Sequence, residues 1–398
     1  MNMAVKLKVK SAFVKSMKSG FPLIKKEAIL NMNDLEKEGS LIELIDDKGM
    51  FLGKGYYGKQ NKGIGWVLTQ QKKEEINQAY FDKKIKKAMD DRNTFFRDKE
   101  TTAFRVFNGE GDGIGGLTID YFAGYYLINW YSEGVYHFKD EVIQAIKNTG
   151  SFKGIYEKKR FAENGTYIED DGFIEGERAP YPLIIKENGM NFAVYLNEGA
   201  MVGIFLDQRD VRQAIRDKYA SGKNVLNTFS YTGAFSVAAA AGGAFKTTSV
   251  DVANRSESKT IEQFSLNGID FEAQDIIVED VFNYFKYAVR KKLVFDLVIL
   301  DPPSYARSKK HTFSAAKDYP SLLEKAVAIT EKNGVIVAST NCSTFGMDKF
   351  KGFIDKAFRE AGSKYKILEE FRLPSDFKTI GTFKEGNYLK VVFIKKLT

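Results

Sequence analysis

From about residue 191 onwards, apolar segments of strand length alternate with segments that have the spacing of an amphipathic helix. The expected strands are residues 224–229, 248–252, 275–278, 295–300, 334–338, 365–370 and 388–395, with helices between them, for instance at 233–241, 255–267 and 319–332. Strands that are apolar throughout and alternate with helices form a parallel sheet that is covered on both faces. This pattern therefore predicts a doubly wound α/β domain over residues 191–398.

The connection before the last expected strand differs from the others. Residues 371–387 are rich in turn-forming residues and have no helical period. A parallel return would need a crossover, so the strand at 388–395 is expected to run antiparallel to its neighbour. An antiparallel last strand is typical of the class I methyltransferase variant of this fold, and not of the dehydrogenase variant.

The first part of the chain has a different character. A chain of 398 residues is too long for one ordinary core, so further domains are expected. Residues 1–75 contain short strands bounded by glycines and carry 14 lysines against 9 acidic residues. We expect a small basic β-barrel that binds RNA, with Lys54 as a candidate contact. Tyr56, Tyr57 and Trp66 either form an aromatic surface between the lysines or fill the barrel core.

Residues 76–190 are expected to form a central α+β domain. They open with a charged helical stretch at 76–100. A glycine-rich stretch follows at 109–117, but no Lys-Ser or Lys-Thr pair comes after it, as a phosphate-binding loop would require. A turn between two strands, with glycines at positive φ, is the better interpretation.

Three consecutive strands of the C-terminal domain end in a carboxylate, at Asp251, Asp280 and Asp301. In an open α/β sheet the ligand binds beyond the carboxyl ends of the strands. Asp251 follows Gly233 by 18 residues, close to the spacing at which an acidic residue reaches a ribose hydroxyl. The loop at 227–233 has one glycine and lacks the Gly-x-Gly-x-x-Gly pattern of a pyrophosphate site. These features suit a cofactor without phosphates, such as S-adenosylmethionine.

The expected cofactor contacts follow from this arrangement. Asp251 is expected to accept a hydrogen bond from the ribose, and Asp280 from the adenine amino group. The methionine part of the cofactor is expected to lie against the loop residues Phe229, Ser230, Tyr231, Thr232 and Gly233.

A rigid turn and a lone thiol are the candidate catalytic features. Residues 301–304 read Asp-Pro-Pro-Ser, and the two proline rings restrict the backbone directly after the acid. Cys342, the only cysteine, precedes a helix that is expected to open near Gly346, and a helix N-terminus favours a thiolate. Because both segments follow strands of one sheet, Asp301 and Cys342 are expected to face one cleft. A lone cysteine can also be a small buried apolar residue, so both interpretations stay open.

The composition argues against several classes of protein. A net charge of +8 fits a polyanionic partner. One cysteine excludes an internal disulfide and a cysteine-based zinc site, and His137 and His311 are far apart, so no metal site is expected. No stretch of 18 apolar residues and no apolar signal core occurs, so we expect no membrane partner and a cytoplasmic location.

Five motifs together resemble one known family. They are Gly-Ile-Gly-Gly-Leu-Thr-Ile-Asp at 113–120, Gly-Ile-Phe-Leu-Asp-Gln-Arg at 203–209, Asn-Thr-Phe-Ser-Tyr-Thr-Gly at 227–233, Asp-Pro-Pro-Ser at 301–304 and Asn-Cys-Ser at 341–343. Along nearly its whole length the chain is similar to the PUA-domain family of 23S ribosomal RNA cytosine-5 methyltransferases, the large-subunit methyltransferase I group.

The resemblance implies a PUA-like domain over residues 1–75, S-adenosylmethionine as the cofactor, and ribosomal RNA, alone or within a ribosomal particle, as the partner. It also implies that Gln208 and Arg209 lie beside the cofactor loop. A homodimer is compatible with it. The candidate substrate contacts that follow the catalytic acid are Pro302, Pro303 and Ser304.

In the mechanism that this resemblance implies, the Cys342 thiolate adds to C6 of a cytosine while Asp301 hydrogen-bonds the ring edge, and the methyl group then moves to C5. The base must be splayed out or flipped to be reached. The chain departs from its relatives at residues 200–202, which read Ala-Met-Val where Gln-Lys-Thr is common. Ser304 stands where many such enzymes have a second cysteine, so another base or water must take the C5 proton.

Two alternative functions stay open. Residues 301–305, Asp-Pro-Pro-Ser-Tyr, also resemble the loop of enzymes that methylate nitrogen atoms and need no thiol. A non-catalytic RNA-binding or ribosome-assembly factor is the other alternative, although such a protein would not need a cofactor pocket.

Overall fold

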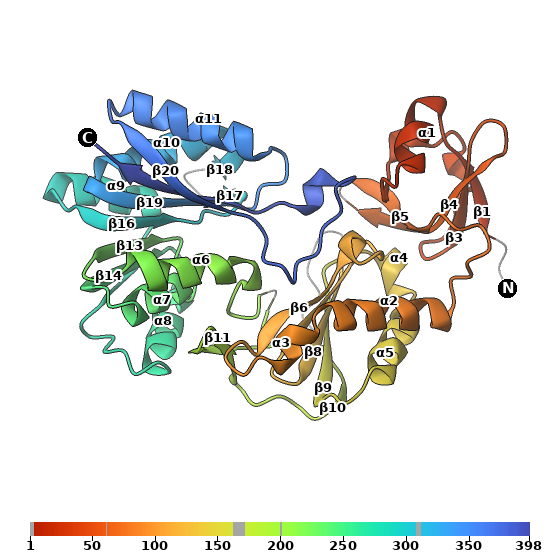
Figure 1. Ribbon diagram of the computed structural model, residues 1–398, viewed down its shortest axis with the longest axis horizontal. Coiled ribbons are helices and arrows are strands. Elements are labelled where there is room, and N and C mark those ends of the chain that lie inside the picture. Colours follow the sequence, from red (N-terminus) through yellow and green to blue (C-terminus); the bar gives the residue numbers. More distant parts are fainter. Residues whose placement is uncertain (1–3, 61, 162–171, 200, 308–311) are drawn as a thin grey trace. The chain divides into compact units, whose positions relative to one another are not determined.

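The computed structural model describes residues 4–60, 62–161, 172–199, 201–307 and 312–398 (Figure 1). The chain forms two compact units. Unit 1 contains the chain up to Leu183 together with Tyr195–Val202 and Ser375–Gly386. Unit 2 contains Ile184–Val194, Gly203–Pro374 and Asn387–Thr398. The chain therefore passes between the units several times, and neither unit is continuous in sequence.

Unit 2 is built on a seven-stranded sheet with the strand order β15-β14-β13-β16-β19-β21-β20. Its strands are β13 (Asn224–Thr228), β14 (Lys246–Asp251), β15 (Asp275–Val278), β16 (Phe295–Leu300), β19 (Thr330–Thr340), β20 (Tyr365–Phe371) and β21 (Lys390–Lys396). The first five pair in parallel, whereas β21 runs antiparallel to both β19 and β20. The predicted class I methyltransferase sheet with an antiparallel last strand is confirmed.

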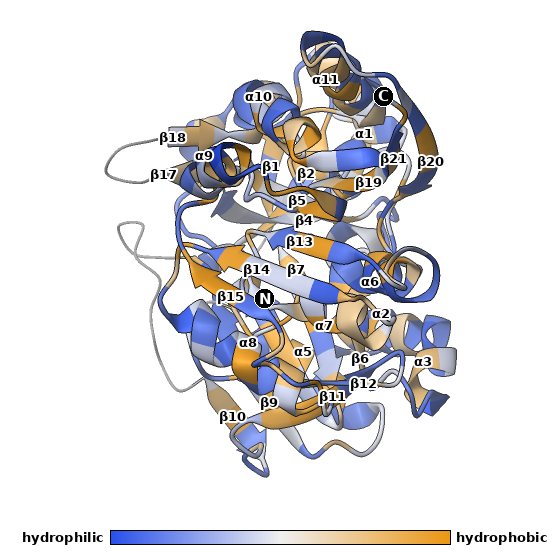
Figure 2. Ribbon diagram, turned by 90° about the vertical axis from the view of Figure 1, so that its left-hand side faces the viewer, coloured by the Kyte–Doolittle hydropathy of each residue, from blue (hydrophilic) through white to orange (hydrophobic). Residues whose placement is uncertain are grey.

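Helices cover both faces of this sheet. They are α6 (Arg209–Ala214), α7 (Ala234–Ala241), α8 (Arg255–Ser265), α9 (Val281–Lys291), α10 (Ala315–Ala328) and α11 (Met347–Glu360). Val298 of β16 packs in one apolar cluster with residues of α9, α10 and α11, while its neighbour Leu297 packs in another with residues of α6 and α7. Helices α10 and α11 combine hydrophobic and hydrophilic residues, as surface helices do (Figure 2).

Helix α10 begins four residues before its predicted start at 319. The backbone N–H of Ser314, the residue before the helix, donates to the Asp318 carboxylate over 2.7 Å. One of the backbone donors at the N-terminus of the helix, which lack a partner within the helix, is thereby hydrogen-bonded. Pro320 therefore lies inside the helix and not at its first turn.

Parallel register brings the ends of the central strands together. Thr228, the last residue of β13, lies opposite Val250 of β14 and Leu300 of β16. Leu300 in turn lies opposite Ala338 of β19. The residues that follow these strands therefore lie along one edge of the sheet, where ligands bind in this class of fold.

Unit 1 contains a small sheet with the order β1-β3-β4-β5-β2. Its elements are β1 (Val5–Lys8), α1 (Ser11–Lys18), β2 (Leu23–Ile24), β3 (Leu41–Ile45), β4 (Phe51–Gln60) and β5 (Gly63–Thr69). Tyr56, Tyr57 and Trp66 are buried. The interpretation of these rings as an aromatic surface for RNA is therefore wrong, and they belong to the core.

A second sheet in unit 1 has the order β10-β9-β8-β7-β6. It comprises β6 (Ala103–Asn108), β7 (Leu117–Phe122), β8 (Tyr125–Trp130), β9 (Gly154–Lys159) and β10 (Phe173–Gly176), with helices α2 (Gln78–Asp91), α3 (Asn93–Arg97), α4 (Glu133–Tyr136) and α5 (Lys139–Asn148). Tyr56 and Trp66 of the first sheet share one apolar cluster with Phe104 and Ile128 of the second. The predicted boundaries at residues 75 and 190 stay predictions.

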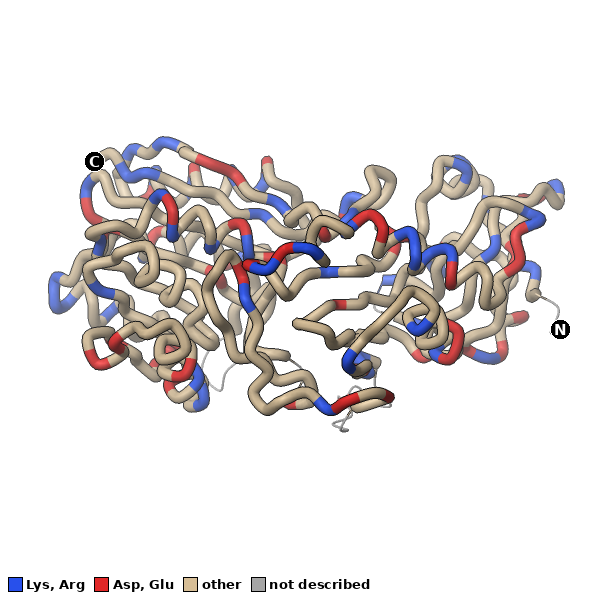
Figure 3. The backbone as a smooth tube through the Cα atoms, turned by 60° about the horizontal axis from the view of Figure 1, so that its bottom comes forward, with Lys and Arg blue, Asp and Glu red and all other residues tan. Residues whose placement is uncertain are grey.

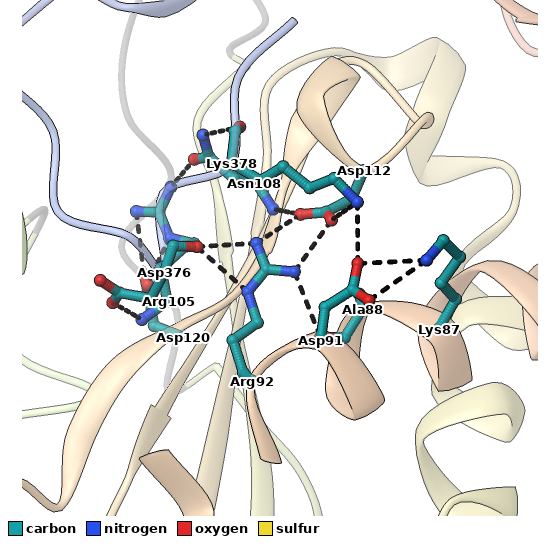
Figure 4. Close-up of polar contacts among 10 residues, drawn as sticks. All are labelled: Lys87, Ala88, Asp91, Arg92, Arg105, Asn108, Asp112, Asp120, Asp376 and Lys378. Carbon is teal, nitrogen blue, oxygen red and sulfur yellow. Dashed lines mark hydrogen bonds and ion pairs between the residues drawn. The ribbon is translucent and has the colours of Figure 1, made fainter. Parts of the chain in front are cut away.

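A segment that lies between β20 and β21 in sequence belongs to unit 1. The Asp376 carbonyl accepts hydrogen bonds from Arg92 over 2.7 and 3.1 Å, and its carboxylate accepts from the Arg105 backbone over 2.8 Å (Figure 4). The Arg92 guanidinium also makes two parallel bonds, of 2.8 and 2.9 Å, to the Asp112 carboxylate. Both side chains of this ion pair are 2% exposed, so residues far apart in sequence share one buried charged cluster.

Candidate active site

The loop after β13 adopts a strained conformation. Phe229, Tyr231 and Gly233 have φ values of 56°, 53° and 78°, in the left-handed region that only glycine adopts at no cost. A Cβ atom at Gly233 would lie 2.5 Å from the Thr260 side chain, so glycine is also required for space. Backbone strain of this kind persists only where the surroundings hold it.

Asp251 holds this loop in place. One carboxylate oxygen accepts from the Tyr231 backbone N–H over 2.9 Å, and the other accepts from the Ala253 N–H over 2.9 Å. Each oxygen has a further lone pair, because a carboxylate can accept about four hydrogen bonds. Asp251 can therefore accept a ribose hydroxyl while it keeps the loop closed.

Asp280 has a structural role that the sequence analysis did not foresee. One of its carboxylate oxygens accepts from the backbone N–H groups of Phe282 and Asn283, over 3.0 and 3.1 Å, and so caps helix α9. Its position two residues after β15, beside β14, still puts it at the same sheet edge as Asp251. Any bond to an adenine amino group would use the second oxygen.

The segment that contains Gln208 lies against this edge. Gln208, in a short helical turn at Leu206–Gln208, donates to Asp301 over 3.1 Å and to Ser339 over 2.8 Å. The Thr232 hydroxyl of the β13 loop donates to the Gly203 carbonyl over 2.7 Å. Arg209 is 4% exposed and lies 3.5 Å from Asp210. Residues 203–209 thus contact both the loop after β13 and the acid of the Asp-Pro-Pro-Ser turn.

Asp301 is a carboxyl group with altered acidity. Burial raises its pKa to about 6, and the nearby Asp207 charge acts in the same direction. Hydrogen bonds from Ser339 and Gln208 and the Arg212 charge oppose this rise without cancelling it. A raised pKa at a buried strand end is typical of a functional acid.

The pKa of Asp301 predicts a pH-dependent effect of Asp301→Asn on stability. The folded protein holds the Asp301 proton more tightly than the unfolded chain, whose aspartates titrate near 4. The wild type therefore loses stability at this residue as the pH rises from 4 through about 6. Relative to wild type, Asp301→Asn should gain about 1 to 2 kcal/mol in free energy of unfolding between pH 4.5 and 7.5.

Scanning calorimetry at both pH values measures this difference. Asp348→Asn is a suitable control, because Asp348 is exposed on α11 and is hydrated in both states. If the difference in free energy of unfolding between Asp301→Asn and wild type does not change with pH, the assignment of the raised pKa to Asp301 is wrong.

The Asp-Pro-Pro-Ser turn contacts the loop after β19. Pro302 is buried and Pro303 is exposed. The Ser304 hydroxyl donates to the side-chain oxygen of Asn341, the residue before Cys342. The loops that carry Asp301 and Cys342 are therefore joined directly by their side chains.

Cys342 is 7% exposed and lies two residues after the end of β19. Its backbone N–H donates to the Thr340 hydroxyl over 3.2 Å, and its Sγ lies 3.1 Å from the Thr344 hydroxyl. Helix α11 begins at Met347, with Gly346 as the preceding residue, as predicted. The side chain belongs to the apolar cluster that contains Phe345, Met347 and Phe350, and its Sγ has a polar neighbour in the Thr344 hydroxyl.

One charged residue at this edge escaped the sequence analysis. Lys390 of β21 is 1% exposed, and its ammonium donates to the Cys342 carbonyl over 2.9 Å. The sequence feature that could have identified it is a lysine within an otherwise apolar strand segment, Leu389-Lys390-Val391-Val392.

Three lysines of this part of the chain have hydrogen-bond or ion-pair partners. The Lys54 ammonium donates to the Glu74 backbone carbonyl over 2.8 Å. Lys59 lies 3.7 Å from Glu38, and Lys62 lies 3.1 Å from Glu385. Basic residues are spread over the whole chain and interleave with acidic ones (Figure 3). The role of Lys54 in RNA binding stays a prediction.

The described part of the chain has neither a cluster of metal ligands nor a membrane-spanning helix. There, no group of three or more His, Cys, Asp or Glu side chains is arranged to hold a metal ion. In the same residues, no helix is both long and apolar enough to cross a membrane.

Comparisons with known proteins agree with this geometry. The sequence model of an S-adenosylmethionine-dependent methyltransferase family matches residues 171–390, and that of a PUA-like domain matches residues 7–70. A Bacillus subtilis protein, YwbD, provisionally named a ribosomal RNA large subunit methyltransferase, is 62% identical over 98% of this chain and 99% of its own. The ribosomal RNA large subunit methyltransferase I of Klebsiella pneumoniae is 30% identical over 94% of each chain.

Two solved structures are similar over 98% of this chain and 100% of their own. SMU.776, provisionally described as a methyltransferase and crystallised with SAH, has a TM-score of 0.91 and 42% identity. A structure from Streptococcus mutans, described in the same provisional way as S-adenosylmethionine-dependent, has a TM-score of 0.89 and 41% identity. The predicted cofactor class and the predicted PUA-like domain are confirmed. The chain belongs to the family of S-adenosylmethionine-dependent methyltransferases with an N-terminal PUA-like domain, to which the large-subunit methyltransferase I enzymes also belong.

Proposed function

We propose that this protein methylates carbon 5 of a cytosine in large-subunit ribosomal RNA, with Cys342 as the nucleophile. Support comes chiefly from one observation. The loops that carry Asp301 and Cys342 follow adjacent parallel strands and are joined by the Ser304–Asn341 hydrogen bond, beside the loop at residues 229–233. The names of the relatives, which specify ribosomal RNA of the large subunit, indicate the substrate class.

The need for a thiol is chemical. Carbon 5 of cytosine is too weak a nucleophile to accept a methyl group unaided. When the Cys342 sulfur forms a bond to C6, the ring becomes enamine-like and C5 gains carbanion character. After C5 is methylated, its proton leaves to a base or to water, and the sulfur–C6 bond breaks to restore the aromatic ring.

Asp301 is suited to stabilise the negative charge that develops on the cytosine ring. With a pKa of about 6, it can hold or release a proton near neutral pH at little cost. We assign it a hydrogen bond to the ring edge at N3, where negative charge would otherwise build up. Pro302, Pro303 and Ser304 would then line the substrate side of the turn.

The residues at the sheet edge fit S-adenosylmethionine, which supplies an activated methyl group on a sulfonium. Asp251 has spare acceptor capacity for a ribose hydroxyl, and Asp280 has a second oxygen for the adenine amino group. The strained backbone of residues 229–233 would face the methionine part, with Gln208 and Arg209 supporting it from the next segment. The absence of a Gly-x-Gly-x-x-Gly loop agrees with a cofactor that has no phosphates.

Residues 1–75 are proposed to supply RNA affinity, and not chemistry. The match to a PUA-like domain at residues 7–70 and the excess of lysine in this part support the proposal. Lys54 remains one candidate contact. Residues 76–190 and 191–398 are the corresponding central and catalytic domains.

One observation keeps methylation of a nitrogen atom as a second candidate. Tyr305, which follows Asp-Pro-Pro-Ser, is 62% exposed, and an aromatic residue after such a turn is able to stack on a base. That reaction would need no thiol, so Cys342 discriminates between the two candidates.

The proposed function predicts the loss of one specific mark. Large-subunit ribosomal RNA from cells that lack this protein should lack one 5-methylcytidine, and restoring the gene should restore it. Mass mapping of nuclease fragments measures the position and the kind of modification. The loss of a nitrogen-methylated nucleoside, or an unchanged pattern in both ribosomal subunits, would overturn the proposal.

A further inference from the structure

A buried lysine contacts the loop that carries Cys342. Lys390 lies in β21, opposite Thr340 in the antiparallel pairing of β21 with β19. Thr340 in turn receives the backbone N–H of Cys342. The lysine is 1% exposed, so its position in the core at this edge of unit 2 is held by packing on all sides.

Within the described residues, Lys390 contacts neutral groups. Its ammonium donates to the backbone carbonyls of Cys342, over 2.9 Å, and of Tyr388. It also lies 5.3 Å from the centre of the Phe345 ring. Among the described residues, no acidic side chain is paired with it. A buried charge without a counter-ion is unfavourable, and an apolar side chain of similar volume would usually be tolerated better.

The electrostatics point to Cys342 as the missing counter-ion. Burial lowers the pKa of Lys390 to about 8, an ionised Cys342 thiol acts to raise it, and Arg372 acts to lower it. The interaction between two titrating groups is reciprocal. The attraction between the Lys390 ammonium and a sulfur anion at residue 342 is therefore mutual.

We infer that Lys390 is a positioning residue for Cys342, because its ammonium binds the backbone carbonyl of Cys342 and so places a positive charge at the residue that carries the thiol. The catalytic consequence rests on the proposed function of Cys342. In general, burial disfavours a thiolate and a nearby positive charge favours it.

The single cysteine permits a direct test in the full-length protein. Alkylation of Cys342 by iodoacetamide is followed by mass spectrometry from pH 6 to pH 10 in wild type and in Lys390→Met. Methionine is about as long as lysine and carries no charge. The half-maximal pH of alkylation should rise by about one pH unit or more in Lys390→Met, the scale of one nearby opposite charge. The covalent adduct with RNA that contains 5-fluorocytidine should form about tenfold more slowly at pH 7.

Lys396 offers a matched control on the same strand. Its ammonium also donates to two backbone carbonyls, those of Val327 and Thr330, over 2.9 and 2.8 Å. Lys396→Met should leave the alkylation curve of Cys342 at its wild-type position. A second variant, Lys390→Gln, keeps a donor for the Cys342 carbonyl but removes the charge, and it should shift the curve as Lys390→Met does.

The outcomes separate this inference from the proposed function. If the alkylation curves of Lys390→Met and Lys390→Gln coincide with wild type, the inference is wrong, whatever Cys342 does in catalysis. If the curves shift but Cys342→Ala retains methyl transfer, the pairing of Lys390 with Cys342 stands and the carbon-5 mechanism fails.

Discussion

Substitution of Cys342 by alanine is expected to abolish methyl transfer to RNA while leaving the affinity for S-adenosylmethionine close to wild type. The reason is that no other residue can replace the thiol, since the chain has one cysteine. A loss of roughly 10⁴-fold or more in rate is expected when a nucleophile that forms a covalent intermediate is removed. The sulfur atom of Cys342 is not among the proposed cofactor contacts, which include Asp251 and Gln208.

Methyl incorporation from labelled cofactor and calorimetric binding measure the two effects separately. Cys342→Ser is the matched control for packing, because it conserves the shape of the side chain and removes only the nucleophilicity. Wild type, but neither variant, should form a denaturation-resistant adduct with RNA that contains 5-fluorocytidine, because fluorine cannot leave C5 as a proton does. Full activity in Cys342→Ala would remove the carbon-5 mechanism and favour methylation of a nitrogen.

Substitution of Asp112 by asparagine is expected to destabilise unit 1 by about 3 kcal/mol or more, because it leaves the Arg92 guanidinium buried without its counter-charge. Arg92 and Asp112 are each 2% exposed, and water cannot compensate for the lost partner. The Asp112 carboxylate also accepts the Asn108 backbone N–H over 2.7 Å. The same guanidinium holds the Asp376 carbonyl (Figure 4), so the effect should extend to the segment Ser375–Gly386.

The two tryptophans make this measurement specific to unit 1. Trp66 and Trp130 both belong to that unit and both are buried. Their fluorescence in urea therefore reports unfolding of unit 1. The control is Asp90→Asn, which breaks the exposed Lys86–Asp90 pair on α2 and should cost less than about 1 kcal/mol. An equal cost for both variants would show that the buried pair has no special role in stability.

Local sequence patterns were sufficient to predict the elements whose structure depends on residues that are neighbours in the chain. Strands β15 and β16 occupy the predicted ranges 275–278 and 295–300, because a short apolar run bounded by turns has one stable conformation in a parallel sheet. The antiparallel β21 followed from a connection without a helical period. The carboxylates at strand ends were likewise visible, since parallel strands bring their carboxyl ends to one edge.

Where a sequence pattern was compatible with two structures, tertiary packing determined which one formed. Tyr56 and Trp66 alternate with lysines and glycines, which fits a surface as well as a core, and they are buried because the second sheet of unit 1 supplies Phe104 and Ile128 against them. Helix α10 extends four residues before the predicted start, since Asp318 binds the Ser314 N–H. The capping role of Asp280 depends in the same way on where α9 begins.

By itself the sequence determined the fold class, the cofactor type and the residues at the sheet edge, because these follow from periodicity, strand ends and motifs that are local in the chain. Only the tertiary structure decided that Ser375–Gly386 belongs to unit 1, where Asp376 meets Arg92, and that Lys390 donates to the Cys342 carbonyl. These contacts join residues 284 and 48 positions apart. The free energy of such contacts comes from burial and charge pairing in three dimensions, which no pattern of sequence neighbours records.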